Sequence, residues 1–449
     1  MIYSLPPNKK CYFYFVVSNK IRTFAAKSKY MEKELFRAII AENQEYIGRI
    51  PLVQRPLDLE EYGNYVFVGV RQAGKSYLLY QRIQQLLANG VEIENIVYVN
   101  FDDERLQGMS VTDLDLILQA YHSMYDSQPI FFFDEIQNVE GWANFARRLA
   151  NQKYRIYITG SNAKMLSRDI ETVLGGRYLD ISVFPYSFSE YLKAVGVLLS
   201  KNWQYGRKAN ELQRHFRTYF DWGGFPELVH FQEKRVWLNS LYNRIFFNDL
   251  VVRHKIKNED ALRLCVRRLA ESVKQPCSLN RLSNLIKATG TSCSPSTVME
   301  YVRYLQESCL LISIDNYVSK FVEKETIKKH YFVDNGLLHL FINNPNTSLL
   351  ENLCAITLYK KYGKGLYYYN KNIEVDFYVP DEGLAVQASY QMSDGETIER
   401  EVKALVALHG LYPLKRAMII TYDDEGEIVR DGLKIEIKPA WKWVVNGEC

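Results

Sequence analysis

Prolines and cysteines are scarce in this 449-residue chain, and each scarcity removes a class of protein. With 13 prolines among a mixture of apolar and charged residues, the composition excludes disorder, collagen and coiled coil as descriptions of the whole chain. The seven cysteines are odd in number, scattered and never spaced as C-x-x-C, which argues against a zinc site and a disulfide framework. Reduced thiols in the cytoplasm are therefore expected.

Long apolar runs are also absent from the sequence. Runs such as residues 11–17 and 130–133 fall far short of the roughly 20 residues that span a bilayer, so no membrane helix is expected. Neither sign of charge dominates, because 56 Lys and Arg face 52 Asp and Glu, for a formal net charge of +4. This mildly basic balance leaves the partners of the protein open.

The chain is long enough for about three domains of roughly 150 residues each. Between residues 31 and 190, continuous apolar runs alternate with helical periods, which predicts an α/β domain with five parallel core strands covered on both faces. The pattern then predicts a helical lid or linker over residues 191–260, a winged-helix-like domain over 261–325 and a further α/β unit over 326–449. Residues 1–30 are expected to be an extension, with Met31 as an alternative start because an amphipathic helix follows it.

A phosphate-binding loop is expected at residues 69–76. An apolar strand precedes this segment and a helix follows it, which is the setting that the motif G-x-x-x-x-G-K-[ST] requires. The glycines let the backbone wrap around phosphates, while Lys75 is expected to meet the β- and γ-phosphates and Ser76 to ligate Mg²⁺. A chance glycine-rich turn is the alternative. The predicted nucleotide-binding residues are Gly69, Val70, Arg71, Gln72, Ala73, Gly74, Lys75, Ser76 and Tyr77.

A second motif supports this prediction, because the apolar run 130–133 ends in Asp134 and Glu135. Asp134 is expected to hold Mg²⁺, and Glu135 to polarise the attacking water. An acidic pair after a strand is also common at the start of a solvated loop. The pair therefore supports a nucleotide site only in combination with the phosphate-loop motif. An additional strand over residues 95–101 predicts that the strands of the two motifs are not neighbours in the sheet.

Taken together, these segments resemble prokaryotic AAA-type ATPases with a C-terminal domain of unknown function whose core is similar to restriction endonucleases. The resemblance covers most of residues 31–449 and implies an AAA-type P-loop sheet, binding and hydrolysis of ATP with Mg²⁺, and homo-oligomers. ATP is favoured over GTP also because no N-K-x-D segment follows the core strands. The segments that carry the resemblance are GVRQAGKSYLL, YVNFDDERL, FFFDEIQNVEGWANFARRL, YITGSNAKMLS, LGGRYLDISVFPYSFSEYL, GGFPELV, YFVDNGLL and IEVDFYV.

The resemblance also implies two further catalytic residues. AAA-type ATPases carry a sensor of the γ-phosphate after the next strand, where Asn162 or Ser161 stands here. They place an arginine finger for a neighbouring subunit near the position of Arg177, which follows Gly175 and Gly176. The alternative for Asn162 and Ser161 is that they are ordinary turn residues. The alternative for Arg177 is a surface arginine after a helix that is capped by glycine.

The C-terminal unit departs from the nuclease pattern that the resemblance implies, D…(E/Q)-x-K, in which carboxylates hold Mg²⁺ and lysine activates water. Asp376 supplies the first acid, and Glu351 or Glu374 could complete a metal site, but Ser389 stands where lysine is expected. Serine cannot supply a cationic amine, so a degenerate unit without nuclease activity is predicted. Acids that simply face solvent at strand ends remain the alternative.

Residues 252–287 are rich in basic side chains beside the predicted winged helix, which favours contact with DNA or RNA phosphates. A solvated helix face or a protein contact would give the same pattern. Our interpretation is a cytoplasmic ATPase, and the alternative is a nucleotide-gated regulator with negligible hydrolysis that binds nucleic acid or protein. The basic residues are Arg253, Lys255, Lys257, Arg263, Arg267, Arg268, Lys274, Arg281 and Lys287.

Overall fold

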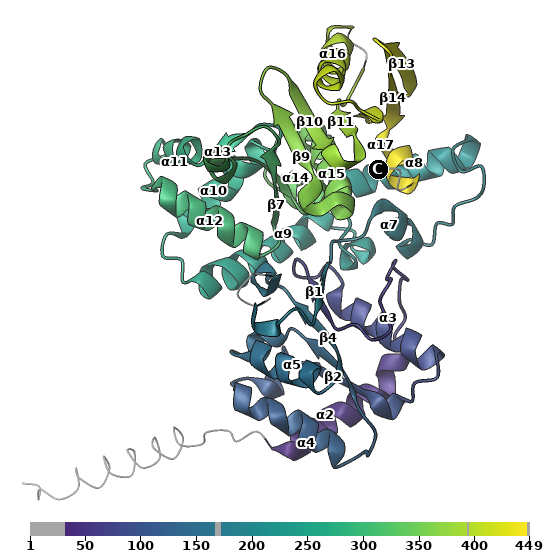
Figure 1. The fold of residues 1–449 in the computed structure, drawn as a ribbon, viewed down its shortest axis with the longest axis vertical. Helices are drawn as coiled ribbons and strands as arrows, with labels where there is room; N and C mark the ends of the chain where they lie inside the picture. The colour runs from purple at the N-terminus through teal and green to yellow at the C-terminus, as the bar shows by residue number, and fades with distance from the viewer. Residues whose placement is uncertain (1–31, 167–171, 393–394, 447–449) are drawn as a thin grey trace, which may run out of the picture.

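The computed structural model describes residues 32–166, 172–392 and 395–446, which form two bodies joined by helices (Figure 1). The expected extension over residues 1–30 and part of the helix expected after Asn162 lie outside these residues. No helix in the described ranges has the length and apolar character that crossing a bilayer requires.

The N-terminal body is built on a five-stranded parallel sheet with the order β2-β3-β4-β1-β5. All five strands occur where apolar runs predicted them. The strand of the phosphate loop, β1, is separated from the acidic-motif strand β3 by β4, which confirms that the two motif strands are not neighbours. The strands are β1 (Tyr65–Val68), β2 (Ile96–Asn100), β3 (Ile130–Asp134), β4 (Arg155–Gly160) and β5 (Leu179–Ser182).

Helices cover both faces of this sheet, as the continuous apolar strands require. Along β1, Val66 and Val68 join a core with α2 (Lys33–Tyr46), α4 (Asp115–His122) and α5 (Trp142–Asn151). The alternate residues Tyr65 and Phe67 join a second core with α3 (Lys75–Ala88). Figure 1 shows α3 on one side of the sheet and α5 on the other.

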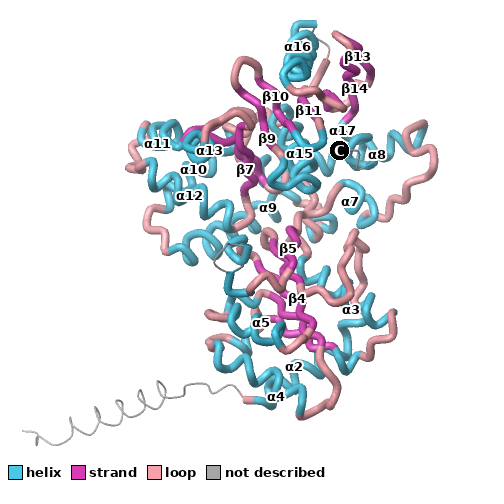
Figure 2. The backbone as a smooth tube through the Cα atoms, in the orientation of Figure 1, coloured by secondary structure: helices cyan, strands magenta, loops and turns pink. Residues whose placement is uncertain are grey.

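A helical segment connects the two bodies, in agreement with the helical pattern of residues 191–260. It contains α7 (Phe188–Ala194), α8 (Gly206–Trp222), the turn Glu227–His230, α9 (Lys234–Arg244) and a π-helical stretch, η8 (Ile245–Val252). In Figure 2, α7 and α9 lie between the sheet of the N-terminal body and the strands of the other body, whereas α8 lies beside α17.

The next elements resemble the winged-helix order of three helices and antiparallel strands, with a fourth, short helix between the last two strands. Serine side chains cap two of the helices: Ser278 accepts from the Arg281 N–H at 3.2 Å, and Ser294 from the Thr297 N–H at 3.1 Å. The elements are α10 (Glu259–Glu271), β6 (Cys277–Ser278), α11 (Leu279–Lys287), α12 (Pro295–Glu307), β7 (Leu311–Asn316), α13 (Phe321–Thr326) and β8 (Ile327–Phe332).

The strands of the region predicted to be winged-helix-like do not form a separate sheet. They continue into a mixed nine-stranded sheet with the order β13-β14-β12-β11-β10-β9-β7-β8-β6, because β7 pairs with β9 in parallel. The domain boundary predicted between residues 325 and 326 therefore falls between β7 and β8, which are hydrogen-bonded neighbours in one sheet. The remaining elements are α14 (Asn335–His339), α15 (Asn346–Tyr362), β9 (Tyr367–Asn370), β10 (Glu374–Val379), β11 (Leu384–Ala388), α16 (Gly395–Leu411), β12 (Arg416–Thr421), β13 (Gly426–Arg430), β14 (Leu433–Pro439) and α17 (Ala440–Asn446).

Candidate nucleotide site

The predicted phosphate loop connects β1 to α3, and its glycines are required by the local geometry. Gly74 has a φ of 93°, in the left-handed region that favours glycine. A Cβ on Gly69 would lie 2.0 Å from the carbonyl oxygen of Val183, so no larger residue fits there. The loop thus ends at the N-terminus of α3, where unpaired N–H groups and the helix dipole favour an anion.

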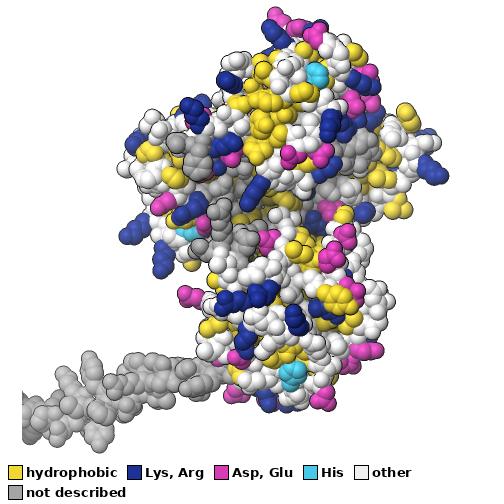
Figure 3. Space-filling model, in the orientation of Figure 1, with side chains coloured by type: hydrophobic (Ala, Val, Ile, Leu, Met, Phe, Trp, Pro, Cys, Tyr) yellow, Lys and Arg dark blue, Asp and Glu magenta, His cyan; other side chains and the backbone are white. Residues whose placement is uncertain are grey.

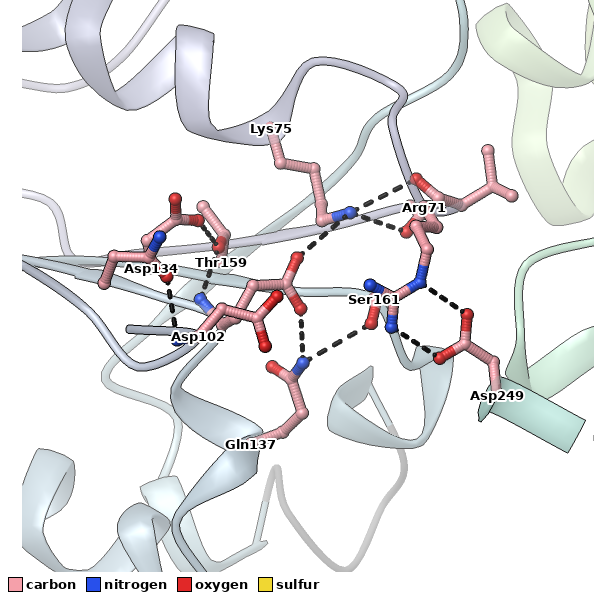
Figure 4. Close-up of polar contacts among 12 residues, drawn as sticks. Arg71, Lys75, Asp102, Asp134, Gln137, Thr159, Ser161 and Asp249 are labelled. Atoms are coloured by element: carbon pink, nitrogen blue, oxygen red, sulfur yellow. Dashed lines mark hydrogen bonds and ion pairs between the residues drawn. The ribbon is translucent and has the colours of Figure 1, made fainter. Parts of the chain in front are cut away.

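Lys75 directs its ammonium group into this site. Nζ donates to the carbonyl oxygens of Gly69 at 3.1 Å and Val70 at 3.2 Å, and lies 3.5 Å from Glu135 Oε1 (Figure 4). The Lys75 side chain is only 4% exposed, so its charge acts in a weakly screened environment. Such a cation can bind a phosphate group at the loop.

Asp134 ends β3 in a fully buried position. Its carboxylate accepts hydrogen bonds from Tyr98 Oη at 2.7 Å and from the Thr159 hydroxyl, and it also interacts with Ser76. Burial and the neighbouring Glu135 raise the pKa of Asp134, and these hydrogen bonds oppose the shift. The paired oxygen donors of Ser76 and Asp134 fit a Mg²⁺ ion, which prefers hard oxygen ligands.

Glu135 adopts a conformation that is uncommon for a residue other than glycine, with a φ of 54°. Its N–H donates to the Thr159 hydroxyl at 2.9 Å, and its carboxylate accepts a hydrogen bond from Gln137. Burial alone would raise the pKa of Glu135, but Lys75, Gln137 and Arg71 outweigh burial, so the pKa lies below its ordinary value. The carboxylate is therefore ionised at neutral pH and able to accept a hydrogen bond from water.

Of the other predicted site residues that the structure describes, Ser161 contacts the hydrogen-bonded groups around Glu135, and Arg177 does not bond to the phosphate loop. Ser161 is 1% exposed and contacts Gln137, whereas Asn162 is half-buried at the start of the next turn. Tyr77 is half-exposed on α3 and packs against Tyr80. The exposed Arg177 donates to the carbonyl oxygen of Gly175 at 3.0 Å rather than to the phosphate loop.

Two side chains of the phosphate loop, at unspecified positions of the motif, form hydrogen bonds with the helical segment. Arg71 forms a bidentate pair with Asp249 of η8, in which both N–O distances are 2.9 Å, and Arg253 reaches the same carboxylate at 3.0 Å. Gln72 Nε2 donates to Glu227 Oε2 at 3.3 Å. The loop that is expected to bind nucleotide is thus bonded directly to the elements that follow the N-terminal body.

The Asp249 carboxylate carries much of this connection, so its neutralisation should be costly. We expect Asp249→Asn to lower the free energy of unfolding by about 3 kcal/mol, because it leaves Arg71 and Arg253 half-buried beside a neutral amide. Thermal and urea unfolding measure this effect. Asp126→Asn, at an exposed loop position, is the matched control and should change stability by less than about 0.5 kcal/mol. Equal stabilities of the two variants would contradict the expectation.

The acids considered for a nuclease site do come together, around an unexpected lysine. Lys329 of β8 is 0% exposed, and its Nζ lies 3.0 Å from Asp376, 3.2 Å from Glu351 and 3.3 Å from Glu374. Ser389, where lysine was expected, instead donates to the carbonyl oxygen of Gln391. In the described part of the chain, no three His, Cys, Asp or Glu side chains are arranged to hold a metal ion.

Sequence reasoning did not single out Gln137, Tyr98, Asp249 or Lys329. Gln137 lies two residues after Glu135, but the direction of a side chain in a short turn cannot be read from sequence. Asp249 is 178 residues from Arg71, and only the folded chain brings them together. Lys329 lies in the strand IKKHYF, where three of the six residues are basic, so the sequence gives no local signal that this lysine is buried.

Two family models match separate parts of the chain. A family model described as an AAA domain matches residues 62–192, and a second, described as a domain of unknown function (DUF8612), matches residues 213–348. Among solved structures, the Walker-type ATPase of Pyrococcus abyssi is 12% identical, covers 70% of this chain and 97% of its own length, and superposes with a TM-score of 0.41. The restriction-endonuclease resemblance of the C-terminal sheet stays a prediction.

Two curated relatives match almost end to end. An uncharacterized protein of Haemophilus influenzae is 29% identical over 389 residues, or 84% of this chain and 93% of the relative. An uncharacterized protein of Methanocaldococcus jannaschii is 31% identical over 443 residues, or 94% of this chain and 98% of the relative. The chain therefore belongs to the family of the M. jannaschii protein, and it carries an AAA-type P-loop domain followed by a domain of unknown function.

Proposed function

We propose that this protein binds ATP with Mg²⁺ and hydrolyses it at the candidate nucleotide site. The observation that carries the proposal is the position of the Glu135 carboxylate, 3.5 Å from the ammonium of Lys75 in the phosphate loop. This arrangement puts a phosphate-binding cation and an ionised acid at the same edge of the sheet. The AAA domain match over residues 62–192 supports the same activity.

Each residue then has a defined task. The loop amides and Lys75 bind the β- and γ-phosphates, and Ser76 and Asp134 hold the metal ion. When bound, Mg²⁺ neutralises charge on the phosphate oxygens. Glu135 accepts a hydrogen bond from the attacking water and aligns it with the γ-phosphorus, so that ADP leaves as the new P–O bond forms. Asn162 is proposed to sense the γ-phosphate, and Arg177 to serve a neighbouring subunit.

Contact with DNA or RNA remains a proposal for the winged-helix region. On the face shown in Figure 3, Lys and Arg side chains occur on both bodies with acidic side chains among them. Several basic residues have partners within the chain, since Arg267 and Arg268 pair with Glu271, and Arg263 lies 4.0 Å from the ring centroid of Phe246. Lys274 is exposed but donates to the Thr347 hydroxyl. The exposed basic residues that remain for a phosphate backbone are Lys255, Lys257, Arg281 and Lys287.

Phosphate release from MgATP tests the proposal. We would measure it across protein concentrations, with single-stranded DNA, duplex DNA or RNA added. Turnover that rises with protein concentration supports an oligomer, and stimulation by one nucleic acid identifies the partner class. Tight ATP binding without turnover under any condition would instead favour the nucleotide-gated regulator.

A further inference from the structure

Gln137 lies between the two motifs of the nucleotide site. It belongs to the 3₁₀ turn Ile136–Asn138, directly after Glu135. Its Nε2 donates to Glu135 Oε2 and lies 3.4 Å from the Ser161 hydroxyl, which it also reaches as a donor (Figure 4). One amide group therefore connects the acid after β3 to the polar end of β4.

The surroundings hold this amide in one orientation. Its carbonyl oxygen is buried against Gly160 and has no hydrogen-bond partner among the described residues. A Cβ on Gly160 would lie 2.7 Å from that oxygen and would overlap Met165 Sδ, so glycine is needed to leave the space. Rotating the amide by 180° would turn its oxygen toward the Glu135 carboxylate, which is repulsive.

Both carboxylate oxygens of Glu135 are consequently engaged. Oε1 faces Lys75 at 3.5 Å, and Oε2 accepts from Gln137. Lys75 is also the group that is expected to turn toward phosphate when nucleotide binds, which would leave Gln137 and Ser161 as the side chains that hydrogen-bond the acid. The amide N–H of Gln137 donates a hydrogen bond but is not acidic, so Gln137 orients the carboxylate without protonating it.

We infer that Gln137 is a positioning residue for ATP hydrolysis: it sets the direction of the Glu135 carboxylate and ties it to Ser161, which directly follows β4. The inference rests on the proposed function and adds a residue to it. A misplacement of about 1 Å in such a group can slow the chemical step about 100-fold, without weakening nucleotide binding.

The test compares Gln137→Met and Gln137→Glu with the wild type and with Gln152→Met, an exposed glutamine in the same domain. Methionine keeps the length of the side chain but donates nothing, so kcat should fall about 10- to 100-fold while the affinity for a fluorescent ATP analogue changes less than twofold. The acid limb of the pH profile of kcat should move to higher pH, because the hydrogen bond from Gln137 lowers the pKa of Glu135.

Gln137→Glu should move the acid limb further than Gln137→Met, because two adjacent carboxylates share a proton. A merely structural role would lower the melting temperature and leave the pH profile where it is. Unchanged kcat and an unchanged profile in both variants, beside active wild type, would overturn the inference and leave the proposed function intact.

If the wild type binds nucleotide but releases no phosphate, the proposed hydrolysis fails and the inference fails with it. An active wild type beside variants with unchanged kcat refutes the inference alone, so the two failures are distinguishable.

Discussion

Purified Glu135→Gln protein should bind MgATP about as tightly as the wild type and release phosphate about 10²- to 10⁴-fold more slowly. Glutamine has nearly the same size as glutamate, so the loop and Lys75 keep their positions. The amide cannot accept a proton from water, and it presents no negative charge to align the water with the γ-phosphorus. Steady-state phosphate release gives the rate, and a fluorescent ATP analogue gives the affinity.

Two further variants make this result specific. Lys75→Ala removes the cation of the phosphate loop and should abolish measurable nucleotide binding, which separates binding from chemistry. Glu140→Gln changes an exposed acid five residues further along the chain and should leave both quantities unchanged. Normal turnover in the Glu135 variant would remove this residue from the catalytic step.

Segments with one strong physical signal were predictable from sequence. The helix at Trp142–Asn151 has the bounds that its apolar period indicates, and the five core strands follow from continuous apolar runs. The hairpin of β13 and β14 was not predicted. The edge strand β13 is half-exposed or exposed at every residue, whereas β14 alternates between buried and more exposed residues and was missed although that pattern is typical of a strand. Strands are thus most readily recognised where both faces of a sheet are covered.

The candidate site shows the same division. Glycines, Lys75 and the acids after β3 are required by phosphate and metal chemistry at fixed spacings, so sequence locates them. The groups that orient them come from other elements: Tyr98 from β2, Thr159 from β4 and Asp249 from η8. Their assignment depends on sheet order and interdomain packing, and neither leaves a local pattern.

The contacts of Arg71 and Gln72 also bear on how the parts of the protein could communicate. Both residues lie within the phosphate loop, and both are bonded to residues in the segment matched by the domain of unknown function. Asp334 of that segment accepts hydrogen bonds from the N–H groups of Gly224 and Gly336, which extends the connection toward the second sheet. A few directional polar contacts therefore connect the phosphate loop with the segment that continues into the C-terminal body.

The largest effect on stability is expected at Lys329. Its ammonium is completely buried among Glu351, Glu374 and Asp376, and those carboxylates raise its pKa against the effect of burial. Lys329→Met keeps an unbranched side chain and removes the charge, leaving carboxylates close together without a cation. We expect the free energy of unfolding to fall by about 3–5 kcal/mol, as for other broken buried pairs. Urea unfolding followed by tryptophan fluorescence measures the change.

The pH dependence identifies the cause. Burial and Asp376 already raise the pKa of Glu351 to about 7, and without the ammonium this carboxyl should hold its proton to still higher pH. The folded variant then binds more protons than the unfolded chain above about pH 4.5, so its stability falls as pH rises. The deficit relative to wild type should be larger at pH 8 than at pH 5.

The neighbouring residue provides the matched control. Lys328 Nζ lies 3.1 Å from Asp315 Oδ1, but both side chains are partly exposed, at 24% and 33%. Lys328→Met should therefore cost less than about 1 kcal/mol. Adding Glu351→Gln to Lys329→Met removes one of the facing charges and should recover part of the loss. A deficit that is equal at both pH values, or that matches the Lys328 variant, would show that charge compensation is not what holds this lysine inside the sheet.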